Sequence, residues 1–285
     1  MGSDADIRSR IEAAAPLLTP TERRLAAALV ADWPFAGLET IQTLAARTQV
    51  SAPTINRFVQ KIGCRGYHDF QRGLIADLKE GQRSPVELRF EATGPAATLA
   101  DFAARTAEVA KSLATGVTEA QFARVCDLLA DDSRNVFVIG GRISDAIALH
   151  LSRHLRQVRR DVFHLPSDPE QWPEYLLRMR SRDVFVLFDF RRYERRLAAL
   201  ARMAARSRRP GIVLVTDKWL SPIAGEATEV LAVPVEVGTA WDTSVAAVAL
   251  VEAMVAQVSE RDWKATRARI RSWDALRLDP EGERP

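Results

Sequence analysis

The chain has 285 residues, of which 47% are hydrophobic, enough for one large domain or two modest ones with buried cores. Basic and acidic residues nearly balance, so the net charge of +3 permits nucleic-acid binding without requiring it. The two cysteines, Cys64 and Cys126, exclude a disulfide framework and show no metal-ligand spacing.

Residues 1–80 are predicted to form consecutive helices without strands. The start of the chain lacks the apolar core of a signal peptide. Thr19 is predicted to cap a helix that Pro20 opens and Pro34 ends, with Glu22 completing a capping box. Further helices are predicted around residues 41–47, 52–62 and 67–78.

The helix predicted over residues 52–62 has one apolar and one polar face. Ile55, Phe58, Val59 and Ile62 follow the spacing of a buried helical stripe. The preceding link "TQVS" has the length of a helix-turn-helix turn, and the polar face carries side chains that can bond bases or phosphates. The residues predicted to contact DNA are Ser51, Pro53, Thr54, Asn56, Arg57, Gln60, Lys61, Arg65 and Tyr67. The alternative is an ordinary surface helix, which also turns polar residues outward.

Residues 81–97 contain two glycines and two prolines without sustained periodicity and are predicted to be a linker. Residues 98–260 show a different sequence pattern from the helical N-terminal region. Two helices come first, followed by five short β-branched, apolar runs that alternate mostly with helical patterns. Such runs predict a parallel sheet covered on both faces, an α/β sandwich. Residues 261–285 are predicted to form a basic amphipathic helix and tail.

The longest apolar run, residues 245–258, contains Glu252 and is too short to span a bilayer. We therefore expect a soluble cytoplasmic protein without a membrane partner. His150 and His154 have a spacing that can bind zinc, but no third ligand is evident. We expect no metal site and no cofactor.

The N-terminal motifs "LTPTERR", "LAARTQVSAPTINRF" and "KIGCRGYHDFQ" together resemble the DNA-binding domain of the RpiR/MurR family of bacterial transcriptional regulators. The resemblance runs over residues 18–74. It implies a winged-helix-like, helix-turn-helix domain whose exposed residues contact bases and phosphates.

Residues 98–260 resemble the sugar isomerase (SIS) domain that follows the linker in this family. In the first loop, "IGGRISDAIALHL", Gly140 and Ser144 match the family, while Arg142 stands where a second glycine is usual. A glycine turn that leads into a helix N-terminus is a ready anion site. The third loop is ordinary, with Thr216 and Ser221 in place.

The second loop departs from the family. Where the family has "S-x-S-G-x-T", this chain reads "DFRRYERR", so Asp189 and Arg191 replace serines and Arg192 replaces the glycine. Arginines can still hold a phosphate or carboxylate through their planar forks. Alternatively, Asp189 and the arginines form an internal ion-pair network. The predicted effector residues are Gly140, Arg142, Ser144, Asp189, Arg191, Arg192, Thr216 and Ser221.

These features predict a non-enzymatic transcriptional regulator, a homodimer or homotetramer that binds palindromic operator DNA under control of a small anionic metabolite. An isomerase-like enzyme is the first alternative, although its phosphate anchor is rewritten and no catalytic histidine or glutamate stands in a recognisable position. A ligand-independent dimeric repressor with a degenerate pocket is the second.

Overall fold

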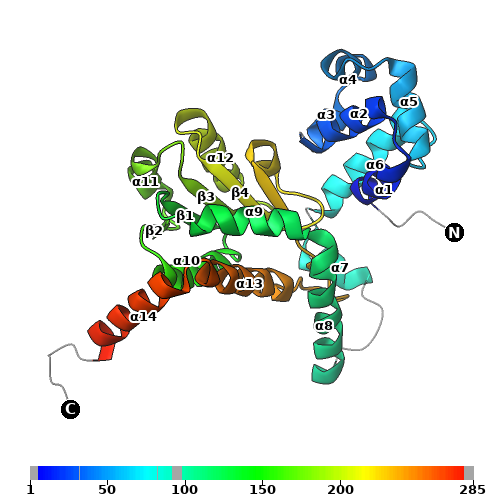
Figure 1. The fold of residues 1–285 in the computed structure, drawn as a ribbon. Coiled ribbons are helices and arrows are strands. Elements are labelled where there is room, and N and C mark those ends of the chain that lie inside the picture. Colours follow the sequence, from blue (N-terminus) through cyan, green and yellow to red (C-terminus); the bar gives the residue numbers. More distant parts are fainter. Residues whose placement is uncertain (1–5, 32, 82, 92–97, 279–285) are drawn as a thin grey trace. The chain divides into compact units, whose positions relative to one another are not determined.

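The computed structural model describes residues 6–31, 33–81, 83–91 and 98–278. The chain divides into two compact units, Met1–Arg83 and Ser84–Pro285 (Figure 1). The first consists of helices, and the second contains a five-stranded sheet. The helical region followed by an α/β sandwich confirms the predicted fold class.

The first unit is built from six α-helices and one short 3-10 helix in its described part, which leaves out residues 1–5, 32 and 82. The α-helices are α1 (Ile7–Ala14), α2 (Pro20–Ala31), α3 (Phe35–Leu38), α4 (Ile41–Thr48), α5 (Ala52–Lys61) and α6 (Tyr67–Glu80). The described residues of this unit form no strand, so a β-wing, which the resemblance implied, is not found in them. The short helices α1 and α3 were not predicted individually.

Two local features set the geometry of α4 and α5. Gln49 ends α4 in the left-handed conformation at φ 54°, and Val50 is buried behind it. Ser51 then caps α5 by accepting a hydrogen bond from the Thr54 amide. The fully buried side chains of Leu44 and Phe58 hold the two helices in one core.

At the start of α2 the predicted capping box is confirmed. Glu22 donates its amide to the Thr19 hydroxyl and accepts the Thr19 amide at 2.8 Å. The helix ends at Ala31.

The second unit contains a parallel sheet with strand order β2-β1-β3-β4-β5. The strands are β1 (Val136–Gly140), β2 (Val162–His164), β3 (Val184–Phe188), β4 (Gly211–Thr216) and β5 (Glu229–Ala232). Every residue of β3 is buried, as expected for a central strand covered on both faces.

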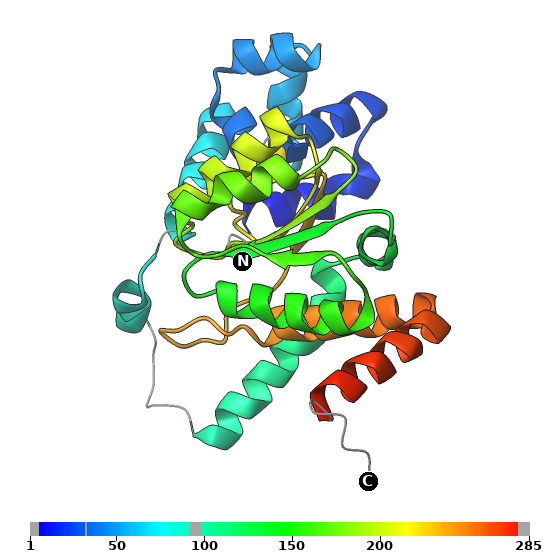
Figure 2. The ribbon, with the colours of Figure 1, turned by 90° about the vertical axis from the view of Figure 1, so that its left-hand side faces the viewer.

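Helices lie on both faces of the sheet. The α-helices of the second unit are α7 (Pro85–Glu91), α8 (Leu99–Gly116), α9 (Glu119–Ala130), α10 (Asp145–Val158), α11 (Trp172–Arg178), α12 (Arg195–Ser207), α13 (Val245–Arg261) and α14 (Trp263–Leu278). Helices α9, α10 and α13 cover one face, and α11 and α12 cover the other (Figures 1 and 2). The basic helix α14 packs against α10, where Arg269 Nε donates to the carbonyl of Arg156 at 2.9 Å.

The linker prediction needs one correction. Helix α7 lies inside residues 81–97, opened by Pro85, which fits the first turn of a helix. Residue 82 and residues 92–97 lie outside the described part. In the described part of the chain, no helix is long and apolar enough to cross a membrane.

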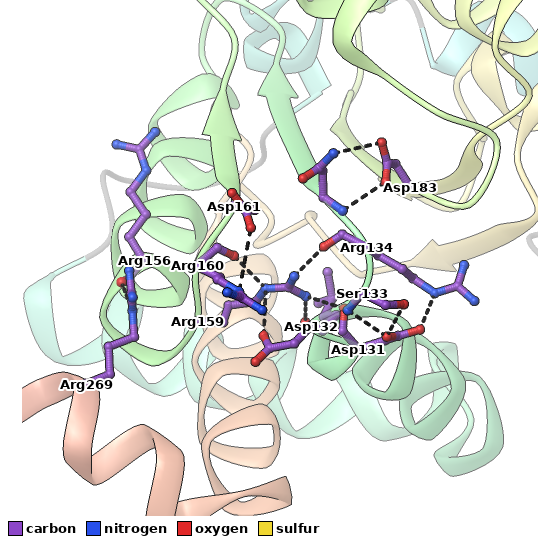
Figure 3. A network of polar contacts seen from close by, with 12 residues as sticks. Asp131, Asp132, Ser133, Arg134, Arg156, Arg159, Arg160, Asp161, Asp183 and Arg269 are labelled. Atoms are coloured by element: carbon purple, nitrogen blue, oxygen red, sulfur yellow. Dashed lines mark hydrogen bonds and ion pairs between the residues drawn. The ribbon is translucent and has the colours of Figure 1, made fainter.

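Buried polar groups fix the amino end of the sheet (Figure 3). The guanidinium of Arg159, which is almost fully buried, donates to the carbonyls of Leu129, Asp131 and Arg134. These carbonyls lie where α9 ends and the chain turns into β1, so they lack helical partners. Asp183 holds the neighbouring turn by accepting the amide of Asn135 at 2.9 Å. The loops at the carboxyl end of the same strands carry the candidate site.

Candidate DNA-recognition helix and effector site

The outer face of α5 carries the predicted DNA-reading residues. Its inner face is fully buried through Ile55, Phe58 and Val59, which fixes the rotation of the helix. Pro53, Asn56, Arg57, Gln60 and Lys61 are exposed on the outside.

Three of the predicted DNA contacts are held by the protein itself. Lys61 Nζ lies 2.6 Å from Glu22 Oε2, and that carboxylate is buried. The Asn56 side chain accepts the Tyr67 amide at 3.3 Å. The Tyr67 hydroxyl donates to the carbonyls of Gly37 and Glu39, and burial raises its pKa to about 12. The first two bonds position α5 against α2 and α6, and the third holds α6 against the end of α3; all three occupy side chains that the sequence assigned to DNA.

The remaining predicted contacts are accessible. Among the described residues, Arg57 bonds only the Thr54 hydroxyl, at 3.1 Å, and the hydroxyls of Ser51 and Thr54 bond each other. The Arg65 side chain is 84% exposed near the start of α6, with Asp69 3.5 Å away. Gln60 and Arg57 are therefore the strongest candidates for base contacts, and Arg65 for a phosphate contact.

The candidate effector site lies at the carboxyl end of the sheet, where three loops follow β1, β3 and β4. Gly140 has no room for a side chain, because a Cβ there would lie 2.5 Å from the Asp145 amide nitrogen. The Ser144 hydroxyl accepts the Gly141 amide at 2.9 Å and donates to the Phe188 carbonyl at 2.6 Å. The first loop is thus tied directly to the end of β3.

Arg191 belongs to a charge network inside the unit. Its Nε lies 3.1 Å from Asp242 Oδ2, and its Nη2 lies 3.7 Å from Glu236 Oε1. The guanidinium carbon lies 3.8 Å from the centre of the Trp219 ring. This arrangement is the internal ion-pair network that the sequence left open as the alternative to anion binding for this residue.

Asp189 bridges the second and third loops. Its Oδ2 accepts the Ser221 hydroxyl at 2.5 Å, and its Oδ1 accepts the Glu194 amide at 3.2 Å. The Thr216 hydroxyl oxygen accepts the Ser221 amide at 3.1 Å. Burial raises the pKa of Asp189 to about 7, so its carboxyl is partly protonated near neutral pH.

Asp217 holds the second loop in place by accepting hydrogen bonds. Its carboxylate accepts the amides of Arg191 and Trp219 and the hydroxyl of Tyr193, the last at 2.6 Å. Burial raises the pKa of Asp217 to about 6. Tyr193 was not predicted as a site residue, and its position in the second loop carries no motif signal that could have found it.

Glu194 is the second residue that the sequence prediction missed. It stands at the last position of the family's "S-x-S-G-x-T" pattern, which was the available signal. Its Oε2 accepts the amide of Arg142 from the first loop at 3.1 Å. It is also the first residue before α12, yet its side chain makes no cap bond with that helix.

The side chains of Arg142 and Arg192 are exposed, and no hydrogen bond or ion pair ties either guanidinium to another described residue. Arg192 adopts φ 69° although it is not glycine. The left-handed region costs an L-residue about 1–2 kcal/mol. The loop therefore keeps the conformation that suits the family's glycine after that glycine has been replaced.

The pair His150 and His154 lies away from these loops on α10. The two rings are 4.6 Å apart in an edge-on arrangement, and His150 Nε2 lies 3.7 Å from Glu252 Oε1. Within residues 6–31, 33–81, 83–91 and 98–278, no three or more histidine, cysteine or acidic side chains are grouped to hold a metal ion.

Solved structures with the same fold extend over one or both units. The Vibrio vulnificus NanR protein complexed with ManNAc-6P is 18% identical, with a TM-score of 0.55, over 98% of this chain and 100% of that one. The sugar isomerase domain of an RpiR transcription factor from Sphaerobacter thermophilus is 19% identical, with a TM-score of 0.56, over 61% of this chain and 97% of that one. An E. coli CFT073 protein in complex with A5P is 17% identical, with a TM-score of 0.52, over 61% and 94%.

No curated protein sequence matches the chain. Two family models do. The helix-turn-helix domain of the rpiR family matches residues 5–81, and the SIS domain matches residues 129–257. With an rpiR-type helix-turn-helix domain followed by a SIS domain, the chain belongs to the RpiR family.

Proposed function

We propose that this chain is a transcriptional regulator that binds operator DNA through α5 and responds to a small anionic metabolite, a sugar phosphate or another phosphate or carboxylate, at the SIS domain. The observation that carries the DNA-binding part is the outer face of α5. There, Arg57 and Gln60 are exposed on a helix whose rotation is fixed by a buried inner face. Arginine and glutamine are side chains that can read guanine and adenine in the major groove.

The effector part is supported by family membership and by the relatives' ligands. One structural relative was solved with ManNAc-6P and another with A5P. In this chain the exposed guanidinium groups of Arg142 and Arg192 supply charge that an anion could use. Bound at the loops, a metabolite would shift the population of DNA-binding states, with a coupling that is typically about 1–3 kcal/mol.

A ligand-independent regulator is the second candidate. It is favoured by one observation: the charges of Asp189, Arg191 and Asp217 are largely engaged within the protein. An enzyme is less well supported, because the helix-turn-helix domain is that of a family of regulators.

To test the DNA-binding proposal, the preferred duplex is first selected from a random library with the full chain. The affinities of the unmodified protein and of Arg57→Ala are then measured for this duplex and for scrambled DNA. We expect a loss of about 1–3 kcal/mol for the selected duplex and a weaker preference over scrambled DNA, because a base contact is removed. Arg24→Ala is the matched control, since Arg24 is an exposed arginine on α2. It should change both affinities equally or not at all. Unchanged preference in Arg57→Ala would show that α5 does not read the bases through this residue.

A further inference from the structure

Several amides and hydroxyls of the three loops are already bonded to the protein's own carboxylates. Asp189, Glu194 and Asp217 together accept four backbone amides and two hydroxyls. A phosphate bound in a loop of this kind needs such donors for itself. Two of the carboxylates, Asp189 and Glu194, stand where the family's pattern has hydroxyl side chains.

Glu194 is the carboxylate that reaches across to the glycine turn. Besides accepting the Arg142 amide, its Oε2 would lie 3.4 Å from a Cβ built on Gly141. Asp189 Oδ1 would lie 3.5 Å from the same point, and Ser144 Oγ 3.4 Å. Two carboxylate oxygens and a hydroxyl therefore cover the turn that leads into α10.

The contact of Glu194 differs from those of its neighbours in one respect. Asp217 is fully buried and Asp189 almost so, and each also accepts a side-chain hydroxyl. Glu194 is only half-buried, and its carboxylate accepts the loop amide of Arg142 without also accepting a side-chain hydroxyl from a described residue. Its side chain can therefore leave the turn at lower cost than the other two.

We infer that Glu194 determines the anion specificity of this site by occupying the Arg142 amide as an internal ligand. An incoming anion has to displace the Glu194 carboxylate from the turn before it can use that amide, and it meets a like charge while doing so. Anions that engage this amide alone therefore bind weakly. Ligands that also engage the exposed guanidinium groups of Arg142 and Arg192 are favoured. The inference rests on the proposed effector site and adds the residue that sets its selectivity.

The test measures inorganic phosphate binding to the full-length protein by titration calorimetry. For Glu194→Ala we expect phosphate to bind at least about tenfold more tightly than to the unmodified protein, because both the competing acceptor and its charge are gone. Glu194→Gln should fall between the two, since its amide oxygen can still accept the Arg142 amide. Helix α12 should persist in both variants, because the Glu194 side chain does not cap it.

Glu260→Ala is the matched control. Glu260 is an exposed glutamate on α13, and its substitution removes the same charge at a position far along the chain from the loops. It should leave phosphate affinity unchanged. Equal or weaker phosphate binding by folded Glu194→Ala overturns the inference. If that variant does not fold, equal or weaker binding by Glu194→Gln overturns it instead.

Operator affinity, measured on the same proteins with and without phosphate, separates this inference from the proposed function. A Glu194→Ala protein that gains phosphate affinity while its operator affinity ignores phosphate leaves the inference intact and contradicts effector control. If the unmodified protein responds to a metabolite but Glu194→Ala gains no phosphate affinity, effector control stands and the inference about Glu194 is contradicted.

Discussion

At the scale of single residues, the second SIS loop replaces hydroxyl chemistry with carboxyl chemistry. Asp189 does what a serine could do, since it bonds the Ser221 hydroxyl and the Glu194 amide, but it does so as a buried acid. Asp217, which directly follows β4, is also buried. Because burial disfavours the charged form, ionising either carboxyl works against folding.

This cost predicts how stability depends on pH. The pKa of Asp189 is raised to about 7 and that of Asp217 to about 6, so between about pH 4 and pH 7 the folded state binds more protons than the unfolded state. Stability of the second unit should therefore fall as pH rises through this range. Asp189→Asn should remove part of the slope, because an amide does not ionise.

Thermal melts at about pH 5 and about pH 8 check this prediction. The unmodified protein should lose several degrees more than Asp189→Asn, at about 2–4 °C for each 1 kcal/mol. Glu260→Gln, which neutralises an exposed acid, should keep the full slope. Parallel pH dependence of Asp189→Asn and the unmodified protein would mean that Asp189 is not a buried acid.

The site was only partly predictable at this scale. The glycine turn and its serine could be found because a strand, a glycine and a helix start stand together in the sequence. The partners of Arg191 could not, since Glu236 and Asp242 lie in a later segment without a motif. Glu194 was within reach, because the last position of the family pattern pointed to it.

At the scale of elements, the strands and the longer helices were predictable, and the short helices were not. Helices α10, α12 and α13 have 13 to 17 residues, long enough for an apolar periodicity to be recognised in the sequence. Helices α3, α7 and α11 have only four to seven residues, too few for a periodic pattern to develop. Helix α5 was predicted correctly, but which of its polar residues bond the protein depended on tertiary contacts.

Lys61 shows the consequence for α5. Its ammonium group pairs with Glu22, which is only 5% exposed. Burial alone would raise the pKa of Glu22, but hydrogen bonds from Lys61 and Thr19 outweigh it, and the pKa is lowered. Ionised Glu22 therefore stabilises the fold above its unfolded pKa, and that contribution is lost as the pH falls through its folded pKa.

We expect Lys61→Ala to destabilise the first unit by about 1–3 kcal/mol, because it leaves the buried Glu22 carboxylate without its cation. Urea unfolding of the full chain measures this loss. Arg57→Ala serves as the comparison. Arg57 donates to the Thr54 hydroxyl at the protein surface, so this substitution should leave stability within about 0.5 kcal/mol. Unchanged stability together with weaker DNA binding in Lys61→Ala would instead make Lys61 a DNA contact, as the sequence predicted.

At the scale of the whole molecule, the chain joins two units with separate cores. One recognition helix touches only a few base pairs, so a regulator of this design gains affinity when two copies bind neighbouring half-sites. The predicted homodimer would present two α5 helices to a palindromic operator with half-sites roughly 34 Å apart, or a multiple of that distance.

The spacing is testable once the operator has been selected. Inserting about half a helical turn, about 5 base pairs, between the half-sites should weaken binding strongly, because it moves one half-site to the opposite side of the duplex. Inserting about one full turn, about 10 base pairs, restores the facing and should weaken binding less. Equal affinity for all spacings in a gel-shift titration would show that each copy binds independently.

The left-handed backbone at Arg192 bears on how distant relatives are recognised. A residue pattern that requires glycine at this position would score the loop as missing, although its chain path persists at φ 69°. A search based on the succession of backbone torsion angles would find this loop regardless of its residue types. Lineages that have exchanged the chemistry of the loop while keeping its shape would then become visible as one group.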